Sequence, residues 1–188
     1  MVGTRHALSA RDEQSVISVK MKKLLIASIF LISLPVFGNA QKINWITFEE
    51  AVKLNETAPK KIFIDVYTDW CGWCKRMDQT TFINKEVVDY MNENYYAVKL
   101  DAEMSDTIVF EGYTYINEGG VNGRKGTHQL AAALLQGRLS YPSYVFMNEK
   151  NQLLTVAHGY MEAKDCLPVL QYIGTDAYLN QTFKDYIK

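Results

Sequence analysis

Runs of apolar, β-branched and aromatic residues recur along the chain and predict the strands of a β-sheet. Three runs have strand character, and a fourth follows the third after a turn-rich tetrapeptide: 61–67, 95–101, 140–147 and 153–158. The first two runs are separated by a helical pattern, which favours a parallel pair joined by a crossover helix. The last two are joined by a short turn, which predicts an antiparallel hairpin.

Apolar residues at helical spacing, preceded by capping residues, predict the helices. The clearest start is Thr47, which forms a capping box with Glu50, and Asn84 is placed to cap another helix. Pro168 fits the first turn of its helix if Asp165 is the N-cap, and otherwise it implies a kink. The expected helices are 47–56, 74–80, a continuation after Asn84, 128–136 behind a Thr127 cap, 163–173 and 177–187.

The segment 102–126 has no clear period and is expected to be an insertion before the third strand. Within it, 107–117 alternates with aromatic residues and predicts a hairpin or a packed loop. The glycine-rich stretch 119–126 predicts turns.

The N-terminus carries a targeting pattern. Basic residues after Met21 precede an apolar run at 24–36 and small residues up to Ala40, which predicts a signal peptide cleaved after Ala40. The alternative is an uncleaved membrane anchor, but the apolar run is shorter than the about 20 residues that a spanning helix needs. We therefore expect cleavage, and no stable membrane insertion after it. The chain then has three parts: 1–20, an upstream extension or misassigned start; 21–40, the signal peptide; and 41–188, the folded domain.

Composition narrows the function. The 188 residues are 48% hydrophobic, which suffices for a packed core, and the net charge of −1 argues against a nucleic-acid partner. The three cysteines, Cys71, Cys74 and Cys166, are too few for a disulfide-stapled scaffold. The chemistry is therefore expected at the close pair.

Cys71 and Cys74 lie where the first strand gives way to a helix. The free N–H groups and the dipole at a helix N-terminus stabilise a thiolate, and two cysteines at this spacing can cycle between dithiol and disulfide. A structural disulfide or half of a zinc site is the alternative, but the remaining ligand candidates, Cys166, His128 and His158, form no second close pair. We therefore predict a redox centre without a metal or a further cofactor. Cys166 is expected to be a small buried hydrophobe, and the histidines receive no role.

Asp65 is the acid within the apolar first strand. Burial there would raise the pKa of its carboxyl group and allow it to relay a proton to or from Cys74. The alternative is a solvated acid on an edge strand.

These residues resemble the thioredoxin superfamily, and specifically its exported bacterial members that act on thiols and disulfides. Trp70-Cys71-Gly72-Trp73-Cys74-Lys75 is similar to the Trp-Cys-Gly-x-Cys-Lys active site of that family. The resemblance implies that Asp65 lies beneath the second cysteine with Lys99 near it. It also implies a cis-proline turn at Tyr141-Pro142 that faces the cysteines and holds a substrate chain, with Gly159 beside the active site. A solvated strand end for Lys99 and a simple strand start at Pro142 are the alternatives.

The resemblance implies a thioredoxin-like α/β fold, with a central mixed sheet flanked by helices, an insertion before the cis-proline strand and an added C-terminal helix. It implies a periplasmic or otherwise exported thiol-disulfide oxidoreductase that acts on protein thiols and disulfides together with a redox partner protein. A metal- or haem-handling thiol protein and a thioredoxin-fold binding module without turnover are the alternatives.

The two tryptophans of the motif bear on partners and on redox direction. Trp73 occupies a position where cytosolic thioredoxins commonly have proline and which affects the redox potential, so the direction of the reaction stays open. Because neighbouring positions around a tight turn cannot all point inward, at least one of Trp70 and Trp73 is expected to offer an exposed surface to partners.

Overall fold

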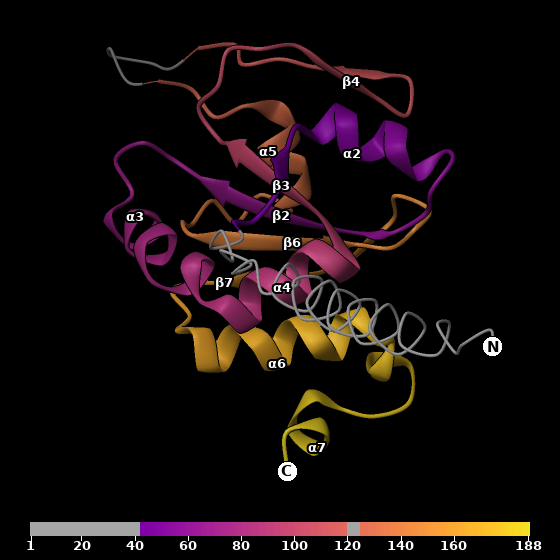
Figure 1. The fold of residues 1–188 in the computed structure, drawn as a ribbon. Helices are drawn as coiled ribbons and strands as arrows, with labels where there is room; N and C mark the ends of the chain where they lie inside the picture. Colours follow the sequence, from indigo (N-terminus) through magenta and orange to yellow (C-terminus); the bar gives the residue numbers. More distant parts are fainter. Residues whose placement is uncertain (1–41, 120–124) are drawn as a thin grey trace, which may run out of the picture. The chain divides into compact units, whose positions relative to one another are not determined.

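Five strands form the central sheet of the computed structural model, which describes residues 42–119 and 125–188 (Figure 1). The strands are β1 (Trp45–Ile46), β2 (Lys61–Tyr67), β3 (Tyr95–Asp101), β6 (Ser143–Met147) and β7 (Leu153–His158). Their order is β1-β3-β2-β6-β7, in which β3 pairs in parallel with β1 and β2, whereas β6 pairs antiparallel with β2 and β7. The predicted parallel pair and the predicted hairpin are both confirmed.

Helices cover both faces of this sheet (Figure 1). One face carries α2 (Phe48–Asn55) and α5 (Gln129–Leu134), and the other carries α3 (Gly72–Gln79), α4 (Lys85–Asn94) and α6 (Ala163–Gly174). A mixed sheet between two helical layers confirms the predicted fold class.

Strand β2 lies in the middle of the sheet, and its first six residues are all buried, which explains the continuous apolar run in the sequence. Alternate side chains of a strand point to opposite faces. Ile62 and Ile64 pack in the core beneath α2 and α5, whereas Phe63 packs in the core beneath α3, α4 and α6. Asp65 therefore shares the face of Phe63, toward the helix that carries the cysteines.

Two helix starts follow the predicted capping chemistry. The Thr47 side chain accepts the Glu50 N–H at 3.2 Å while the Glu50 carboxylate accepts the Thr47 N–H at 2.9 Å, which completes the capping box. Asn84 caps α4 by accepting two backbone N–H groups, after a short 3-10 turn at Thr81–Ile83. These caps fix where the helices on either side of the sheet begin.

Two other predicted caps are wrong. The N-cap of α5 is His128 rather than Thr127, because the His128 Nδ1 atom accepts the Leu130 N–H at 3.2 Å. Helix α6 begins after Glu162, so Asp165 lies in its first turn and is not the N-cap. Pro168 consequently lies inside α6, where it provides no N–H for the helical ladder.

The single C-terminal helix predicted for 177–187 is replaced by two short elements. A 3-10 turn at Ala177–Leu179 is followed by α7 (Phe183–Tyr186), a single turn of helix. Thr182 starts α7 by accepting the Asp185 N–H, so its side chain serves as a cap instead of continuing a helix.

The insertion contains a hairpin, which is one of the two structures predicted for 107–117; the other is a packed loop. Strands β4 (Ile108–Phe110) and β5 (Tyr113–Tyr115) pair antiparallel, apart from the main sheet. Ile108 is buried in the core, and the Phe110 ring packs edge-on against Phe48 of α2 with centroids 5.0 Å apart.

The predicted signal peptide, its predicted cleavage after Ala40 and the predicted upstream extension lie outside the described residues, as does part of the turn-rich stretch. Among the residues that are described, no helix has the length and apolar character needed to cross a membrane.

Candidate active site

Cys71 and Cys74 form a disulfide at the N-terminus of α3, with their Cα atoms 5.3 Å apart. Cys71 is the N-cap residue in an extended conformation, and its sulfur accepts the Cys74 N–H at 3.0 Å. Both side chains are buried. The predicted placement at a helix start is confirmed, and the same N–H group and helix dipole would stabilise a Cys71 thiolate after reduction.

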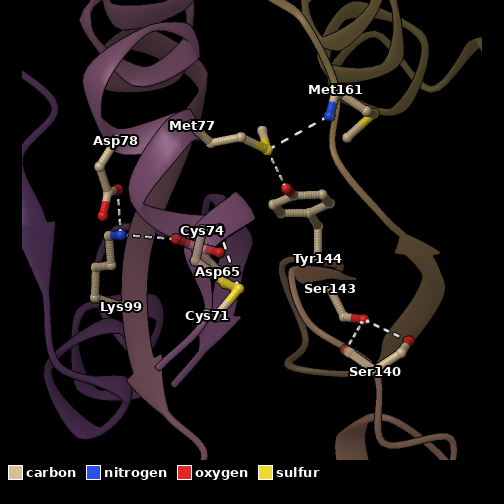
Figure 2. Close-up of a disulfide and its surroundings, with 10 residues drawn as sticks. All are labelled: Asp65, Cys71, Cys74, Met77, Asp78, Lys99, Ser140, Ser143, Tyr144 and Met161. Carbon is tan, nitrogen blue, oxygen red and sulfur yellow. Dashed lines mark hydrogen bonds and ion pairs between the residues drawn. A yellow bond between two sulfur atoms is a disulfide. The ribbon is translucent and has the colours of Figure 1, made fainter. Parts of the chain in front are cut away.

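Asp65 is buried in the surroundings of this disulfide, with 1% of its surface exposed (Figure 2). Its Oδ2 atom lies 2.8 Å from the Lys99 ammonium group, and among the described residues its Oδ1 atom has no hydrogen-bond partner. Burial raises the pKa of Asp65 to about 6, although the positive charge of Lys99 opposes this shift. The predicted burial is confirmed, and a carboxyl group that titrates near neutral pH is suited to exchange protons.

Lys99 is the partner of Asp65 and not a solvated strand end. Its Nζ atom also contacts the Asp78 carboxylate, and it lies 5.0 Å from the ring centroid of Tyr67 and 5.1 Å from that of Trp45. Burial alone would lower the pKa of Lys99, but the two carboxylates outweigh burial and raise it. Lys99 is therefore a fixed positive charge beside the buried acid.

The loop that enters β6 has the cis Tyr141-Pro142 peptide bond. The Gly159 N–H donates to the Pro142 carbonyl at 2.9 Å, and Gly159 has a φ of +93°, which favours glycine. Behind the proline, the Ser143 hydroxyl donates to the Ser140 carbonyl at 2.6 Å and lies 2.7 Å from His158 Nδ1. The structure thus brings Pro142 and Gly159 together.

Both tryptophans of the motif are exposed, Trp70 at 66% and Trp73 at 61%. Trp70 donates its indole N–H to Glu103 at 2.9 Å and packs edge-on against Tyr141, with centroids 5.8 Å apart. Trp73 lies against Tyr160 at 5.1 Å. Gly72 and Lys75, the other motif residues, are exposed on the first turn of α3. Exposed aromatic side chains therefore border the cysteines. The prediction that at least one of Trp70 and Trp73 is exposed is confirmed.

A groove of about 660 Å³ adjoins Trp70 and is also lined by Asp69, Glu103 and Lys125. Glu103 follows β3, so the insertion that begins there contributes to the surface beside the disulfide.

Met77 is a residue of the site that the sequence analysis missed. Its sulfur accepts hydrogen bonds from the Tyr144 hydroxyl group and, at 3.5 Å, from the Met161 N–H (Figure 2). It thereby joins α3, the proline-led strand β6 and the segment after Gly159. The available signal was its position three residues after Cys74, on the same helical face.

Replacing Met77 with leucine is expected to lower the free energy of unfolding. Leucine has a similar volume but no acceptor, so the buried Tyr144 hydroxyl group and the partly buried Met161 N–H would lose their partner, at a cost of about 1–3 kcal/mol. Urea unfolding would measure the loss. Met91→Leu, at another fully buried methionine, is the matched control, and equal losses in both variants would contradict the role of the sulfur.

The remaining candidate metal ligands lie in separate settings. His128 is buried and its Nε2 atom lies 2.9 Å from the Asp106 carbonyl oxygen, whereas His158 contacts Ser143. Cys166 is a buried free thiol in α6, as predicted, and burial raises its pKa to about 12. Within 42–119 and 125–188, no three His, Cys, Asp or Glu side chains gather as metal ligands would.

Solved structures share this fold. A thioredoxin-fold protein from Helicobacter pylori has a TM-score of 0.52 and 22% identity, covering 69% of this chain and 83% of its own. DsbH oxidoreductase has a TM-score of 0.52 and 16% identity, covering 76% and 92%. A candidate disulphide isomerase from Bacteroides thetaiotaomicron has a TM-score of 0.51 and 26% identity, covering 73% and 97%.

Curated relatives are matched over shorter stretches. An uncharacterized protein from Archaeoglobus fulgidus is 28% identical over 87 residues, which is 46% of this chain and 68% of that protein. Spermatogenesis-associated protein 20 from Rattus norvegicus is 38% identical over 56 residues, which is 30% of this chain and 7% of that protein.

The family comparison spans nearly the whole described domain. The model of the Thioredox_DsbH family, described as protein of unknown function DUF255, matches residues 36–184. These residues include the disulfide, Asp65, Lys99 and the Pro142 loop. The chain has a thioredoxin-like fold of the kind found in disulfide oxidoreductases, and it belongs to the Thioredox_DsbH family.

Proposed function

We propose that the protein is an exported thiol-disulfide oxidoreductase that exchanges disulfides with protein substrates through Cys71 and Cys74. The observation that carries the proposal is the Cys71–Cys74 disulfide at the start of α3, with Asp65 buried in its surroundings. A disulfide that served only to stabilise the fold would need neither this buried acid nor its lysine partner.

In the reducing direction, the Cys71 thiolate attacks one sulfur of a substrate disulfide. A mixed disulfide forms at Cys71, and the other substrate sulfur leaves as a thiolate that takes up a proton. Cys74 then loses its proton to the Asp65 carboxylate and attacks the Cys71 sulfur, which releases the second substrate thiol. Two electrons have passed to the substrate, and the Cys71–Cys74 disulfide has formed. A redox partner protein reduces it again, and the reverse sequence oxidises a dithiol.

The substrate would approach over the exposed rings of Trp70 and Trp73 and the loop at Tyr141 and Pro142. The reduction potential of the Cys71–Cys74 pair decides whether the protein mainly reduces or oxidises its substrates. Trp73, which lies between the cysteines, influences this potential. A potential near about −270 mV would indicate a reductant, and one near about −120 mV an oxidant. Export rests on the predicted signal peptide at 21–40.

Disulfide exchange with a protein substrate tests the proposal. Reduced protein mixed with insulin is expected to lose the two thiols of Cys71 and Cys74 for each insulin disulfide reduced, whereas a double variant, Cys71→Ser with Cys74→Ser, is expected to reduce none. Wild-type protein that performs no better than the double variant would overturn the proposal.

Two measurements on the same preparation identify the other classes. Stoichiometric metal after purification under reducing conditions, found by elemental analysis, would indicate a metal-handling thiol protein. Partner binding that is indifferent to oxidation, without turnover, would indicate a binding module.

A further inference from the structure

Lys99 lies between two carboxylates that differ in their access to solvent. Its ammonium group is 2.8 Å from Asp65 Oδ2, which is almost fully buried, and it also contacts Asp78 Oδ1, whose side chain is 43% exposed. Figure 2 shows the Lys99 ammonium group joined by dashed lines to both carboxylates, with Asp78 on α3, Lys99 on β3 and Asp65 on β2. Asp78 stands four residues after Cys74, so the helix that carries the cysteines also carries this second acid.

We infer that Asp78 is a positioning residue for the proposed proton transfer, because it holds the Lys99 ammonium group at the solvent edge and withholds part of its charge from Asp65. The inference deepens the proposed function and rests on it. It assigns to Asp78 no contact with the substrate.

Asp78 disfavours the charged form of Asp65 in two ways. Asp78 is a negative charge near Asp65, which disfavours a second negative charge there. Asp78 also shares the lysine that would otherwise neutralise Asp65 alone. Both effects raise the pKa of Asp65, in addition to the larger effect of burial. Without Asp78, Lys99 would pair with Asp65 alone, because the aromatic rings around Lys99 would keep its side chain near Asp65 but offer no competing carboxylate.

In the part of the chain that the structure describes, Tyr144, Cys166 and Tyr67 are titratable neighbours of Asp65 that stay uncharged near neutral pH. Tyr144 of β6 is opposite Asp65 in the sheet register, and burial raises the pKa of its hydroxyl group far above neutral. Cys166 of α6 has a pKa of about 12 for the same reason, and the pKa of Tyr67 is raised as well. Asp78 is thus the neighbour whose removal changes the charge around Asp65 without disturbing the buried core.

Titration of Asp65 in the oxidised protein tests this inference without requiring turnover. The carboxyl ¹³C resonance of Asp65 is expected to titrate near pH 6 in the wild type. In Asp78→Asn its midpoint is expected to fall by roughly half a pH unit or more, since this is the scale of a screened charge a few ångströms away. Asp78→Glu is expected to restore the midpoint.

Asp89→Asn is the matched control. Asp89 is an acid on α4 that is 40% exposed and also paired with a lysine, Lys85, but it takes no part in the Asp65 network. An Asp65 midpoint that is unchanged or raised in Asp78→Asn, or lowered equally by Asp89→Asn, would overturn the inference.

The pH profile of insulin reduction separates this inference from the proposed function. If the wild type reduces insulin and the acid limb of its profile moves to lower pH in Asp78→Asn, both stand. An unmoved limb in an active Asp78→Asn protein removes the role of Asp78 and leaves the function intact. If the Asp65 midpoint falls in Asp78→Asn but the wild type reduces no disulfide, the proposed function fails and the role of Asp78 in proton transfer fails with it, whereas the electrostatic effect of Asp78 on Asp65 stands.

Discussion

The Cys74→Ser variant is expected to accumulate covalent complexes with protein substrates. Cys71 can still attack a substrate disulfide, but the serine hydroxyl cannot displace the substrate from the mixed disulfide, so the intermediate persists. Non-reducing electrophoresis followed by mass spectrometry would show adducts that dithiothreitol releases. Turnover of insulin is expected to fall to the uncatalysed background.

Cys71→Ser is the matched comparison, because it removes the cysteine at the helix N-cap and retains the other. It is expected to form no adducts, since the helix start favours the thiolate at Cys71. Equal trapping by the two variants, or trapping by neither in the presence of a disulfide substrate, would contradict the roles given to these cysteines.

Replacing Asp65 with asparagine is expected to slow the resolving step about a hundredfold, which is the lower end of what a positioned proton acceptor contributes. The shape of the side chain is retained, but it can no longer accept the proton of Cys74. The wild-type rate should rise with pH through about 6 as Asp65 ionises, and the variant should lack this rise. Stopped-flow measurements of substrate thiol release would separate the resolving step from the first attack. A variant with the same rate and the same pH profile would exclude Asp65 as the acceptor.

The same substitution is expected to stabilise the fold at neutral pH. Folding raises the pKa of Asp65 from 3.8 to about 6, so the folded state binds the proton more tightly than the unfolded state. The stability from this group is complete below the unfolded pKa and is lost as pH rises through the folded pKa. Between pH 4 and pH 8 the free energy of unfolding of the wild type should therefore fall by about 2–3 kcal/mol relative to that of Asp65→Asn. Urea unfolding at the two pH values would measure this difference, and a constant difference would contradict it.

The parts of the fold that the sequence predicted well are those with strong local signals. The β2 and β3 strands have the expected bounds because one is a continuous apolar run and the other follows a capped helix. The capping box at Thr47 and the helix start at Cys71 depend on contacts within a few residues, so their residue types were sufficient.

The sequence predictions were wrong or incomplete for residues whose partners are distant in the sequence. His128 caps α5 while its ring also reaches the Asp106 carbonyl group, a contact across the insertion that local preference for threonine could not reveal. Likewise, Asp78 and Met77 are ordinary helix residues in the sequence, and only the packing of α3 against β3 and β6 gives them partners near Asp65. The burial of Asp65 could be foreseen from its strand, whereas the shared lysine could not.

Cys166 lies in the core behind this chemistry as a free thiol with 1% of its surface exposed. In the folded chain it is insulated from both oxidant and alkylating reagent, because burial keeps it protonated and out of reach. A label on Cys166 can therefore be acquired only by a molecule whose core has opened, so the labelling of this thiol measures transient unfolding of the domain.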